Sequence, residues 1–422
     1  MLNRREFLRT AAPAAAGAAL AGCRIVPPQS WKAVPAEKLR RGAVVIERVQ
    51  AFRLRYDVVG HFKFFQSVPG VPYGRPAVLV KITASNGAVG WGQSVPSHRW
   101  SYETLESAAT TIETYLAPEL AGKDPLDILG AHAAMNRVIA AGFSTGMPVA
   151  KAGIDLALHD LAGKLAGKPL AHLWGLPAGG KVTLSWTLNP KTPDEADAAI
   201  EEGWKRGYRN FNVKIAPDLE ADLALCRKVK ARVPDGFLWA DANGGYDLDA
   251  ALAAAPKLAE AGVAVLEQPL PANRITGYQR LKQQGALPIV LDEGVVSFED
   301  LVEFHKLGMM DGVTIKPARC GGLLAARKMI GYLRENGLIF LGSGLTDPDV
   351  ALAASLILFA SAGLDRPAAL NGPQYLGGSV LRCPLAPEAD GTIAVPEGVG
   401  LGVEVDESKI RALSADRKAN GE

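Results

Sequence analysis

The sequence predicts an α/β protein built around a (β/α)8-type barrel, with a smaller α+β domain that caps it. Short runs rich in Val, Ile and Leu recur about every 25 residues in the second half of the chain, and helix-like segments separate them. Gly or Pro bounds these runs, as is typical of buried parallel strands. Several runs end in a polar residue, and (β/α)8 barrels carry their functional groups at the carboxyl ends of the strands.

Length and composition exclude some classes of protein. The chain has 422 residues, 48% of them hydrophobic and 21% charged, which is enough for one barrel and a smaller domain. The formal net charge of +2 is too close to zero for nucleic-acid binding by bulk electrostatics. No basic cluster is interleaved with aromatic residues, so no nucleic-acid partner is expected.

The amino-terminal segment predicts export. Residues 3–9 resemble a twin-arginine signal, and the Ala-rich run that follows ends in Leu20-Ala21-Gly22-Cys23, which resembles a bacterial lipobox. This run is shorter than the roughly 20 apolar residues of a membrane span. We therefore expect residues 1–23 to be a signal with lipidation at Cys23, and residues 24–42 to be a linker. The mature protein would be a periplasmic lipoprotein anchored to a membrane. The alternative is an Ala-rich helix with two unrelated arginines.

Residues 43–147 are predicted to form the α+β capping domain. Residues 44–56 alternate apolar and polar side chains, and residues 77–85 and 88–95 form a hairpin around Asn86-Gly87. Helices are expected at residues 102–119 and 125–141. The long lid loop, residues 57–75, carries Phe62, Phe64 and Tyr73, which we expect to contact substrate. Alternatively, these aromatic side chains only pin the loop to its domain.

Residues 148–374 are predicted to form the barrel domain. A helix begins at Pro148, a residue favoured at the first helical position. The first barrel strand is expected at residues 181–189, the seventh near Leu338 and the eighth near Asn371. Residues 375–415 return to hairpin-like turns, and we expect this tail to complete the capping domain.

Three carboxylates, at Asp241, Glu267 and Asp292, follow three successive predicted strands. Buried side by side without partners, they would repel one another strongly. A divalent cation relieves that repulsion, and oxygen ligands without Cys or His favour a hard metal such as Mg²⁺. The alternative is that the carboxylates are structural salt-bridge partners at helix starts.

Two lysines flank the three strands that carry the carboxylates. Lys214 ends the predicted strand before them and Lys316 ends the predicted strand after them, so a closed barrel brings the lysines to a substrate from opposite sides. A nearby cation makes a lysine a usable base near neutral pH. A metal that binds a substrate carboxylate stabilises the dianion formed when the α-proton leaves. Two bases on opposite faces allow proton removal on one face and return on the other, which inverts the stereocentre.

The motifs "VKIA", "DANGG", "EQP", "DEG" and "IKPARCGGL", with the tail "VPEGVGLGVEVDE", resemble in order and spacing those of one enzyme family. This is the mandelate racemase/muconate-lactonising enzyme family of the enolase superfamily, and the likeness to the muconate-lactonising group extends from about residue 44 to residue 410. The resemblance implies a modified TIM barrel, a small carboxylate substrate and one Mg²⁺ ion per site. It also implies frequent homo-oligomers.

The family's residue roles carry over by position. The resemblance implies that Asp241, Glu267 and Asp292 bind the metal and that Lys214 and Lys316 are the acid/base residues. Asn243 and Glu293 match supporting positions, and a hydrogen bond from Lys316 to Glu293 is expected.

The chain departs from the family pattern in two substrate contacts. Asn212 replaces the first lysine of the Lys-x-Lys motif that ends in Lys214. Asn371 ends the segment that holds an Asp-x-Asp pair in dipeptide epimerases, so a free α-ammonium would lack its counter-charge here. No His follows His305, which disfavours the His-dependent chemistry of the mandelate-racemase and sugar-acid-dehydratase groups.

These observations predict a Mg²⁺-dependent racemase or epimerase that acts on an amino-acid derivative or dipeptide. One alternative is a cycloisomerase or dehydratase that uses the same site. A second alternative is a ligand-binding lipoprotein without turnover.

Overall fold

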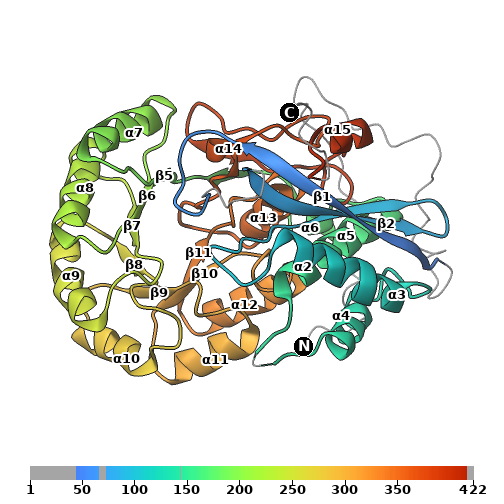
Figure 1. Ribbon diagram of the computed structural model, residues 1–422, viewed down its shortest axis with the longest axis horizontal. Coiled ribbons are helices and arrows are strands. Elements are labelled where there is room, and N and C mark those ends of the chain that lie inside the picture. Colours follow the sequence, from blue (N-terminus) through green and yellow to red (C-terminus); the bar gives the residue numbers. More distant parts are fainter. Residues whose placement is uncertain (1–43, 66–72, 143, 416–422) are drawn as a thin grey trace, which may run out of the picture.

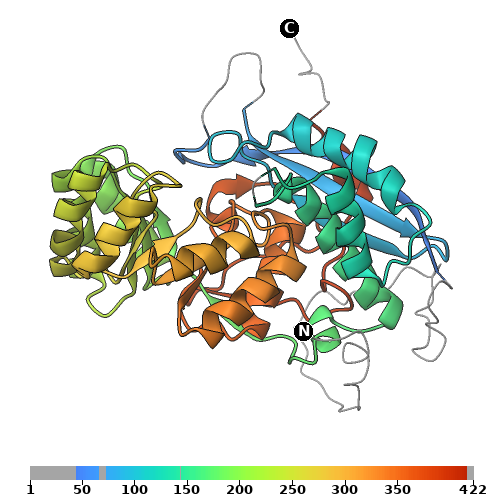
Figure 2. The same ribbon diagram turned by 90° about the horizontal axis from the view of Figure 1, so that it is seen from below.

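The computed structural model describes residues 44–65, 73–142 and 144–415. The predicted signal, Cys23 and the linker lie outside these residues. Figures 1 and 2 show two parts side by side, a curved array of green-to-orange helices around parallel strands and a blue antiparallel sheet with teal helices. Within the described ranges, no helix is both long and apolar enough to cross a membrane.

The capping part is built on an antiparallel sheet with the strand order β12-β1-β2-β3. Its strands are β1 (Ile46–Val58), β2 (Arg75–Ala84), β3 (Val89–Ser94) and β12 (Leu376–Gly377). The predicted turn at Asn86-Gly87 joins β2 to β3, with Gly87 at φ +82° and Asn86 Oδ1 accepting a hydrogen bond from Ala88 N at 3.1 Å. Glycine adopts that positive φ without steric cost, which explains the sharp reversal.

The helices of the capping part are shorter than the sequence predicted. They are α2 (Leu105–Thr110), a π-helical stretch η2 (Thr111–Leu116), α3 (Ala117–Leu120) and α4 (Ile128–Val138). Thr104 and Ser107 form a reciprocal capping box that starts α2, and Asp127 accepts a hydrogen bond from Gly130 N at the start of α4. The caps explain why α2 and α4 each begin three residues later than expected.

The barrel strands form one parallel sheet in chain order, as expected for repeated βα units. The strands are β5 (Trp186–Leu188), β6 (Phe211–Lys214), β7 (Leu238–Asp241), β8 (Val265–Glu267), β9 (Ile289–Leu291), β10 (Gly312–Ile315) and β11 (Ile339–Gly342). The helices between and after them are α7 (Pro193–Lys205), α8 (Leu219–Arg232), α9 (Leu248–Glu260), α10 (Ile275–Gln284), α11 (Phe298–Lys306), α12 (Leu323–Glu335) and α13 (Asp349–Ser361). Side chains of Asp218, Asp247 and Ser297 cap α8, α9 and α11, so several helices begin where the sequence places an N-cap residue.

A short segment at residues 368–369 closes the barrel between β11 and β5. Ala368 forms a parallel bridge with Leu184, and Ala369 forms one with Ser343. Ala369 N donates a hydrogen bond to Gly342 O at 2.9 Å. This segment is the eighth strand that the sequence predicted near Asn371, and the predicted fold class is confirmed.

The predicted first barrel strand, residues 181–189, is divided in the structure. Its first part, β4 (Lys181–Thr183), pairs antiparallel with β13 (Thr392–Ala394), and only β5 belongs to the parallel sheet. The tail is divided as well. Its two ends lie on β1, through β12 and through the hydrogen bond from Ala415 N to Arg53 O, while β13 stays on the barrel. The described residues also form three short helices, α6 (Leu170–Leu173), α14 (Gly372–Tyr375) and α15 (Glu407–Ala412).

Helix α5 (Pro148–Ala166) is buried along nearly its whole length between the antiparallel sheet and the barrel. A buried network beside it fastens the sheet to α13. Tyr56 donates to Asp349 Oδ2 at 2.6 Å, Gln93 donates to Tyr56 at 2.9 Å, and Ala351 N donates to Gln93 Oε1 at 3.3 Å. These contacts join the capping sheet to the first turn of α13, the helix that follows β11.

Candidate active site

Three buried carboxylates meet at the carboxyl ends of adjacent strands. Asp241 ends β7, Glu267 ends β8 and Asp292 follows β9 directly, and their side chains are at most 1% exposed. One oxygen from each carboxylate lies within 4.8 Å of the others. The parallel register of β7, β8 and β9 brings the three together, because the ends of neighbouring parallel strands share one edge of the sheet.

The basic side chains around the triad are fixed by two of its members. Lys214, the last residue of β6, donates to Asp241, and Lys316, directly after β10, donates to Asp292. Arg319 also donates to Asp292 and reaches Thr314 O at 2.6 Å. Arg319 is 1% exposed and was missed by the sequence reasoning, although it lies in the "IKPARCGGL" motif. Its position in that motif was the signal that would have found it.

The carboxyl group of Glu267 is only partly hydrogen-bonded. Its Oε2 accepts a hydrogen bond from Trp239 Nε1, but its buried Oε1 has no partner among the described residues. Burial, and then the charge of Asp241, raise the pKa of Glu267 to about 8. A buried carboxylate oxygen without a donor is costly, and a bound cation would satisfy it.

The donor set fits Mg²⁺. Three carboxylates offer only oxygen ligands, which are those that hard divalent cations prefer. Burial alone would raise the pKa of Asp241, but neighbouring lysine charges, that of Lys214 first, lower it below its ordinary range. At neutral pH, Asp241 is therefore available as an anionic ligand.

Asn243 and Glu293 support the triad in a different way from the one expected. Asn243 N donates to Asp241 Oδ1 at 2.8 Å, and Asn243 Nδ2 donates to Asp241 Oδ2 at 3.1 Å and Glu293 Oε1 at 2.9 Å. The expected hydrogen bond from Lys316 to Glu293 is absent among the described contacts, because Lys316 points to Asp292 instead. Asn243 adopts φ +45°, a conformation that Asn tolerates better than most residues.

Gln268 joins two of the ligand-bearing strands and was also missed. It is fully buried beside Glu267, and its Oε1 accepts hydrogen bonds from Asp292 N at 2.9 Å and Gly294 N at 3.2 Å. Its Nε2 donates to Leu270 O at 3.0 Å. Gln268 therefore fixes the position of Asp292 relative to Glu267.

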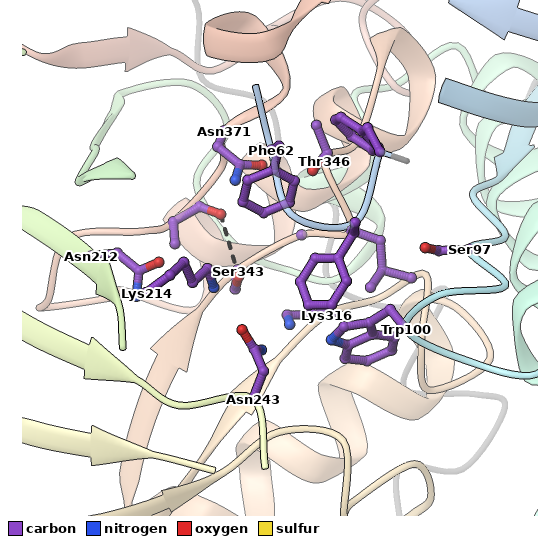
Figure 3. A pocket seen from close by; sticks show the side chains of 15 residues that line it. Phe62, Ser97, Trp100, Asn212, Lys214, Asn243, Lys316, Ser343, Thr346 and Asn371 are labelled. Carbon is purple, nitrogen blue, oxygen red and sulfur yellow. Dashed lines mark hydrogen bonds between the residues drawn. The ribbon is translucent and has the colours of Figure 1, made fainter. Parts of the chain in front are cut away.

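The two lysines face one pocket from different strands, with β7, β8 and β9 between those that carry them. Figure 3 shows Lys214 beside Asn212 and Lys316 beside Trp100. Including its opening, the pocket encloses about 440 Å³. Its walls come from the lid loop, the segment after β3 and the barrel strand ends, namely Phe62, Phe64, Phe65, Ser97, Trp100, Asn212, Lys214, Asn243, Lys316, Ser343, Gly344, Leu345, Thr346, Ala369 and Asn371.

Four of the five predicted substrate contacts line this pocket, namely Asn212, Asn371, Phe62 and Phe64. Asn212 is 1% exposed and Asn371 is 8% exposed, and each has one buried side-chain polar atom with no hydrogen-bond partner among the described residues. Tyr73 is instead 48% exposed and is not among the lining residues. The sequence could not separate Tyr73 from the other aromatics because all three belong to one loop.

The described part of the lid loop is held by aromatic contacts. Phe62 stacks on Tyr375 with ring centroids 4.9 Å apart, and Phe65 lies 5.3 Å from Phe62. Lys63, which the sequence reasoning did not single out, lies between them in the chain. Burial lowers its pKa to about 8, against the opposing charge of Asp241. The loop thus brings apolar walls and one further cationic side chain to the site.

Two family comparisons agree with this geometry. Residues 194–409 match the family described as "Enolase C-terminal domain-like", and residues 70–175 match "Mandelate racemase / muconate lactonizing enzyme, N-terminal domain". The chain belongs to the mandelate racemase/muconate lactonizing enzyme family. A chloromuconate cycloisomerase from Cupriavidus necator is 32% identical over 79% of this chain and 90% of its own length. An N-succinyl-L-Arg/Lys racemase from Bacillus cereus is 26% identical over 80% of this chain and 90% of its own.

Solved structures of the same family superpose on nearly the whole chain. A 2-chloromuconate cycloisomerase from Rhodococcus opacus has a TM-score of 0.79 at 26% identity, covering 88% of this chain and 99% of that one. A muconate lactonizing enzyme from Klebsiella pneumoniae has a TM-score of 0.78 at 27% identity, covering 89% and 100%. Within the family, the relatives therefore include both cycloisomerases and a racemase.

Proposed function

We propose that this protein removes a proton α to a carboxylate in a Mg²⁺-dependent reaction and returns it on the opposite face, as a racemase or epimerase. The observation that carries the proposal is the pair of lysines at the carboxyl ends of β6 and β10, which reach one pocket from either side of the buried carboxylates. A single base would suffice for an elimination, whereas inversion needs an acid/base on each face.

Each group has a defined task in this mechanism. When bound, Mg²⁺ supplies positive charge that holds a substrate carboxylate and stabilises the charge developing on it. Lys214 removes the α-proton from one enantiomer, and Lys316 delivers a proton to the other face. For the opposite enantiomer the two lysines exchange roles. Phe62 and Phe64 exclude water from the pocket.

The substrate class follows from the two asparagines. Within the described part of the chain, Asn212 Nδ2 is a buried donor without an acceptor and Asn371 Oδ1 is a buried acceptor without a donor. Asn371 Nδ2 is directed at Thr187 Oγ1 at 3.4 Å, so its oxygen faces away from that contact. A substrate amide matches both atoms, since its C=O accepts from Asn212 and its N–H donates to Asn371. We therefore propose N-acylated amino acids or dipeptides. The racemase relative from Bacillus cereus supports this choice, because its name describes an N-succinylated substrate.

Cycloisomerisation is the second candidate. Several relatives are chloromuconate or muconate cycloisomerases, and one of them reaches 32% identity. The same lysines would serve such a reaction, with one as acid/base and the other as an electrostatic partner. A dehydration would use the two lysines in the same two roles. Asn371 Oδ1 favours racemisation of an amide substrate, because the carboxylates of a muconate could accept a hydrogen bond from Asn212 Nδ2 but a muconate has no N–H to donate to Asn371.

The test is incubation of N-succinylated, N-acetylated and N-methylated amino acids, dipeptides and muconates in D₂O with Mg²⁺. Gain of one deuterium with loss of optical purity supports racemisation, whereas lactone or alkene products without inversion support the second candidate. Tight binding of a probe without exchange or product at any Mg²⁺ concentration would favour a binding lipoprotein and refute the proposal.

Variants of the two lysines sharpen the test. Lys214→Ala and Lys316→Ala should each lower racemisation by about 10²- to 10⁴-fold, the usual contribution of a positioned acid/base. Lys282→Ala is a matched control, because it removes another Lys–Asp ion pair. Lys282 pairs with Asp311, which directly precedes β10, at the end of that strand opposite Lys316. Racemisation at the wild-type rate in either test variant would refute the two-base mechanism.

We also propose that the chain is exported by the twin-arginine route and anchored to a membrane by lipid at Cys23. The support is the sequence of residues 3–23. Labelling with palmitate that disappears in Cys23→Ala would support the anchor, and an unlabelled wild-type protein would refute it. Homo-oligomerisation, which the family resemblance implies, is tested by the mass of the purified protein in solution.

A further inference from the structure

Lys316 has a partner outside the barrel. Its ammonium nitrogen lies 4.6 Å from the centroid of the Trp100 ring, and the two side chains line the same pocket (Figure 3). Trp100 belongs to the segment between β3 and α2, so it comes from the capping part, whereas Lys316 follows β10. An ammonium over an indole face is attracted by the ring quadrupole, most strongly where little water intervenes, and Lys316 is only 5% exposed.

The position of Trp100 is held by its own turn. Trp100 N donates to Ser97 O at 3.1 Å, and Ser101 N donates to the same oxygen at 2.7 Å. The ring is partly buried against the main hydrophobic core. Trp100 is therefore presented to Lys316 by ordered backbone.

A buried arginine fastens this turn to the barrel. Arg75 is 1% exposed and donates to Pro96 O and, at 3.0 Å, to Val95 O, the residues just before Ser97. The same guanidinium donates to Leu345 O through Nε at 3.1 Å and Nη2 at 2.6 Å. Leu345 follows β11 and lines the pocket, so Arg75 ties the Trp100 turn to the barrel wall beside Lys316.

The two lysines differ in this respect. Lys214 donates to Asp241 as Lys316 donates to Asp292, but no aromatic ring contacts the Lys214 ammonium in the part of the chain that the structure describes. A lysine side chain has four rotatable bonds, so an ammonium held only by a carboxylate keeps several orientations. The Trp100 ring selects one of them for Lys316 alone.

We infer that Trp100 is a positioning residue for Lys316, which makes proton transfer on the Lys316 face of the substrate dependent on the capping part. The inference rests on the two-lysine function proposed above. Trp100 orients the ammonium and does not itself exchange a proton. Its loss should impair one face of the substrate and spare the other.

The experiment compares Trp100→Leu and Trp100→Phe with the wild-type full-length protein. The L and D enantiomers of N-succinylarginine are incubated separately in D₂O with Mg²⁺, and initial deuterium incorporation is measured. Lys316→Ala identifies the enantiomer that Lys316 deprotonates. Trp100→Leu should slow exchange from that enantiomer by about tenfold and change the other by less than about twofold, while Trp100→Phe retains most of the rate.

Trp174→Leu is the matched control. Its ring lies 4.4 Å from the Arg327 guanidinium and is not among the pocket residues, so its removal costs a similar contact without touching Lys316. Both enantiomers should exchange at the wild-type rate in this control. Equal slowing of the two enantiomers in Trp100→Leu, or no slowing of either, would overturn the inference.

A measurement without turnover separates this inference from the proposed function. In protein labelled with ¹³C at the lysine Cε atoms, the Lys316 methylene signal, assigned with Lys316→Ala, should be shifted upfield by the indole ring and should lose that shift in Trp100→Leu. An unshifted signal in the wild type would overturn the inference. If the wild type exchanges no probe while the shift is present, the proposed function fails and the contact stands.

Discussion

Binding of Mg²⁺ to the carboxylates of Asp241, Glu267 and Asp292 is expected to release a proton near neutral pH. Burial and the charge of Asp241 raise the pKa of Glu267 to about 8, so its carboxyl group is largely protonated below that pH. A metal ligand must be deprotonated, and the proton therefore leaves when the cation arrives. The buried Oε1 of Glu267 has no partner among the described residues, so a bound cation would supply its missing interaction.

The magnitude follows from linkage. With a pKa of about 8, about 97% of Glu267 is protonated at a pH of about 6.5, so close to one proton should leave per ion bound. The apparent affinity should rise about 20-fold between a pH of about 6 and about 7.5, and should level off above about 8.5.

The assay is titration calorimetry with Mg²⁺ at a pH of about 6.5, repeated in buffers that differ in ionisation enthalpy, because the apparent heat then reports the number of protons released. Glu267→Gln carries no titrating proton, and it should bind Mg²⁺ weakly and release none. Glu103→Gln is the matched control, since Glu103 is another buried carboxyl group with a raised pKa but lies beside α5. Tight binding with no proton release by the wild-type protein would refute the reasoning.

Two stability predictions test the framework that carries the site. Burial raises the pKa of Glu103, which accepts hydrogen bonds from Val149 N and Ala150 N, to about 7. The pKa of Glu103 is higher in the folded protein than in the unfolded chain, so its contribution to the free energy of unfolding is largest at low pH. That contribution declines as the pH rises through the unfolded pKa and then the folded pKa. The free energy of unfolding should fall by about 2 kcal/mol from this group between a pH of about 5 and about 7.5, measured by urea unfolding. Glu103→Gln should remove that dependence, and an unaltered pH profile in this variant would contradict the assignment. Gly92→Ala should destabilise the protein by about 3 kcal/mol, because its Cβ would lie 2.0 Å from Gly153 O. Gly331→Ala, in α12 with nothing within 4 Å, should instead stabilise by up to about 1 kcal/mol, and equal effects of the two would refute the packing argument.

Interactions that depend on neighbours in the chain could be predicted from the sequence. The Asn86-Gly87 turn specifies its hairpin through the positive φ that Gly87 accepts. The helix caps at Asp218 and Asp247 start α8 and α9 for equally local reasons. The predictions were less complete where local signals compete with distant partners. Residues 181–183 were predicted to belong to the first barrel strand, but in the structure they pair with β13, which lies far away in the sequence.

The sequence by itself determined the barrel, the three clustered carboxylates and the two lysines, because the βα period and the alignment of parallel strand ends bring those residues to one edge. Only the tertiary structure decided which groups those side chains contact. Lys316 contacts Asp292 and the Trp100 ring and not Glu293, and one pocket is lined by Asn212 and Asn371, each with a buried polar atom that has no partner among the described residues. The physical reason is that these contacts join segments far apart in the chain, whose mutual orientation is set by the packing of the capping sheet and α5 against the barrel.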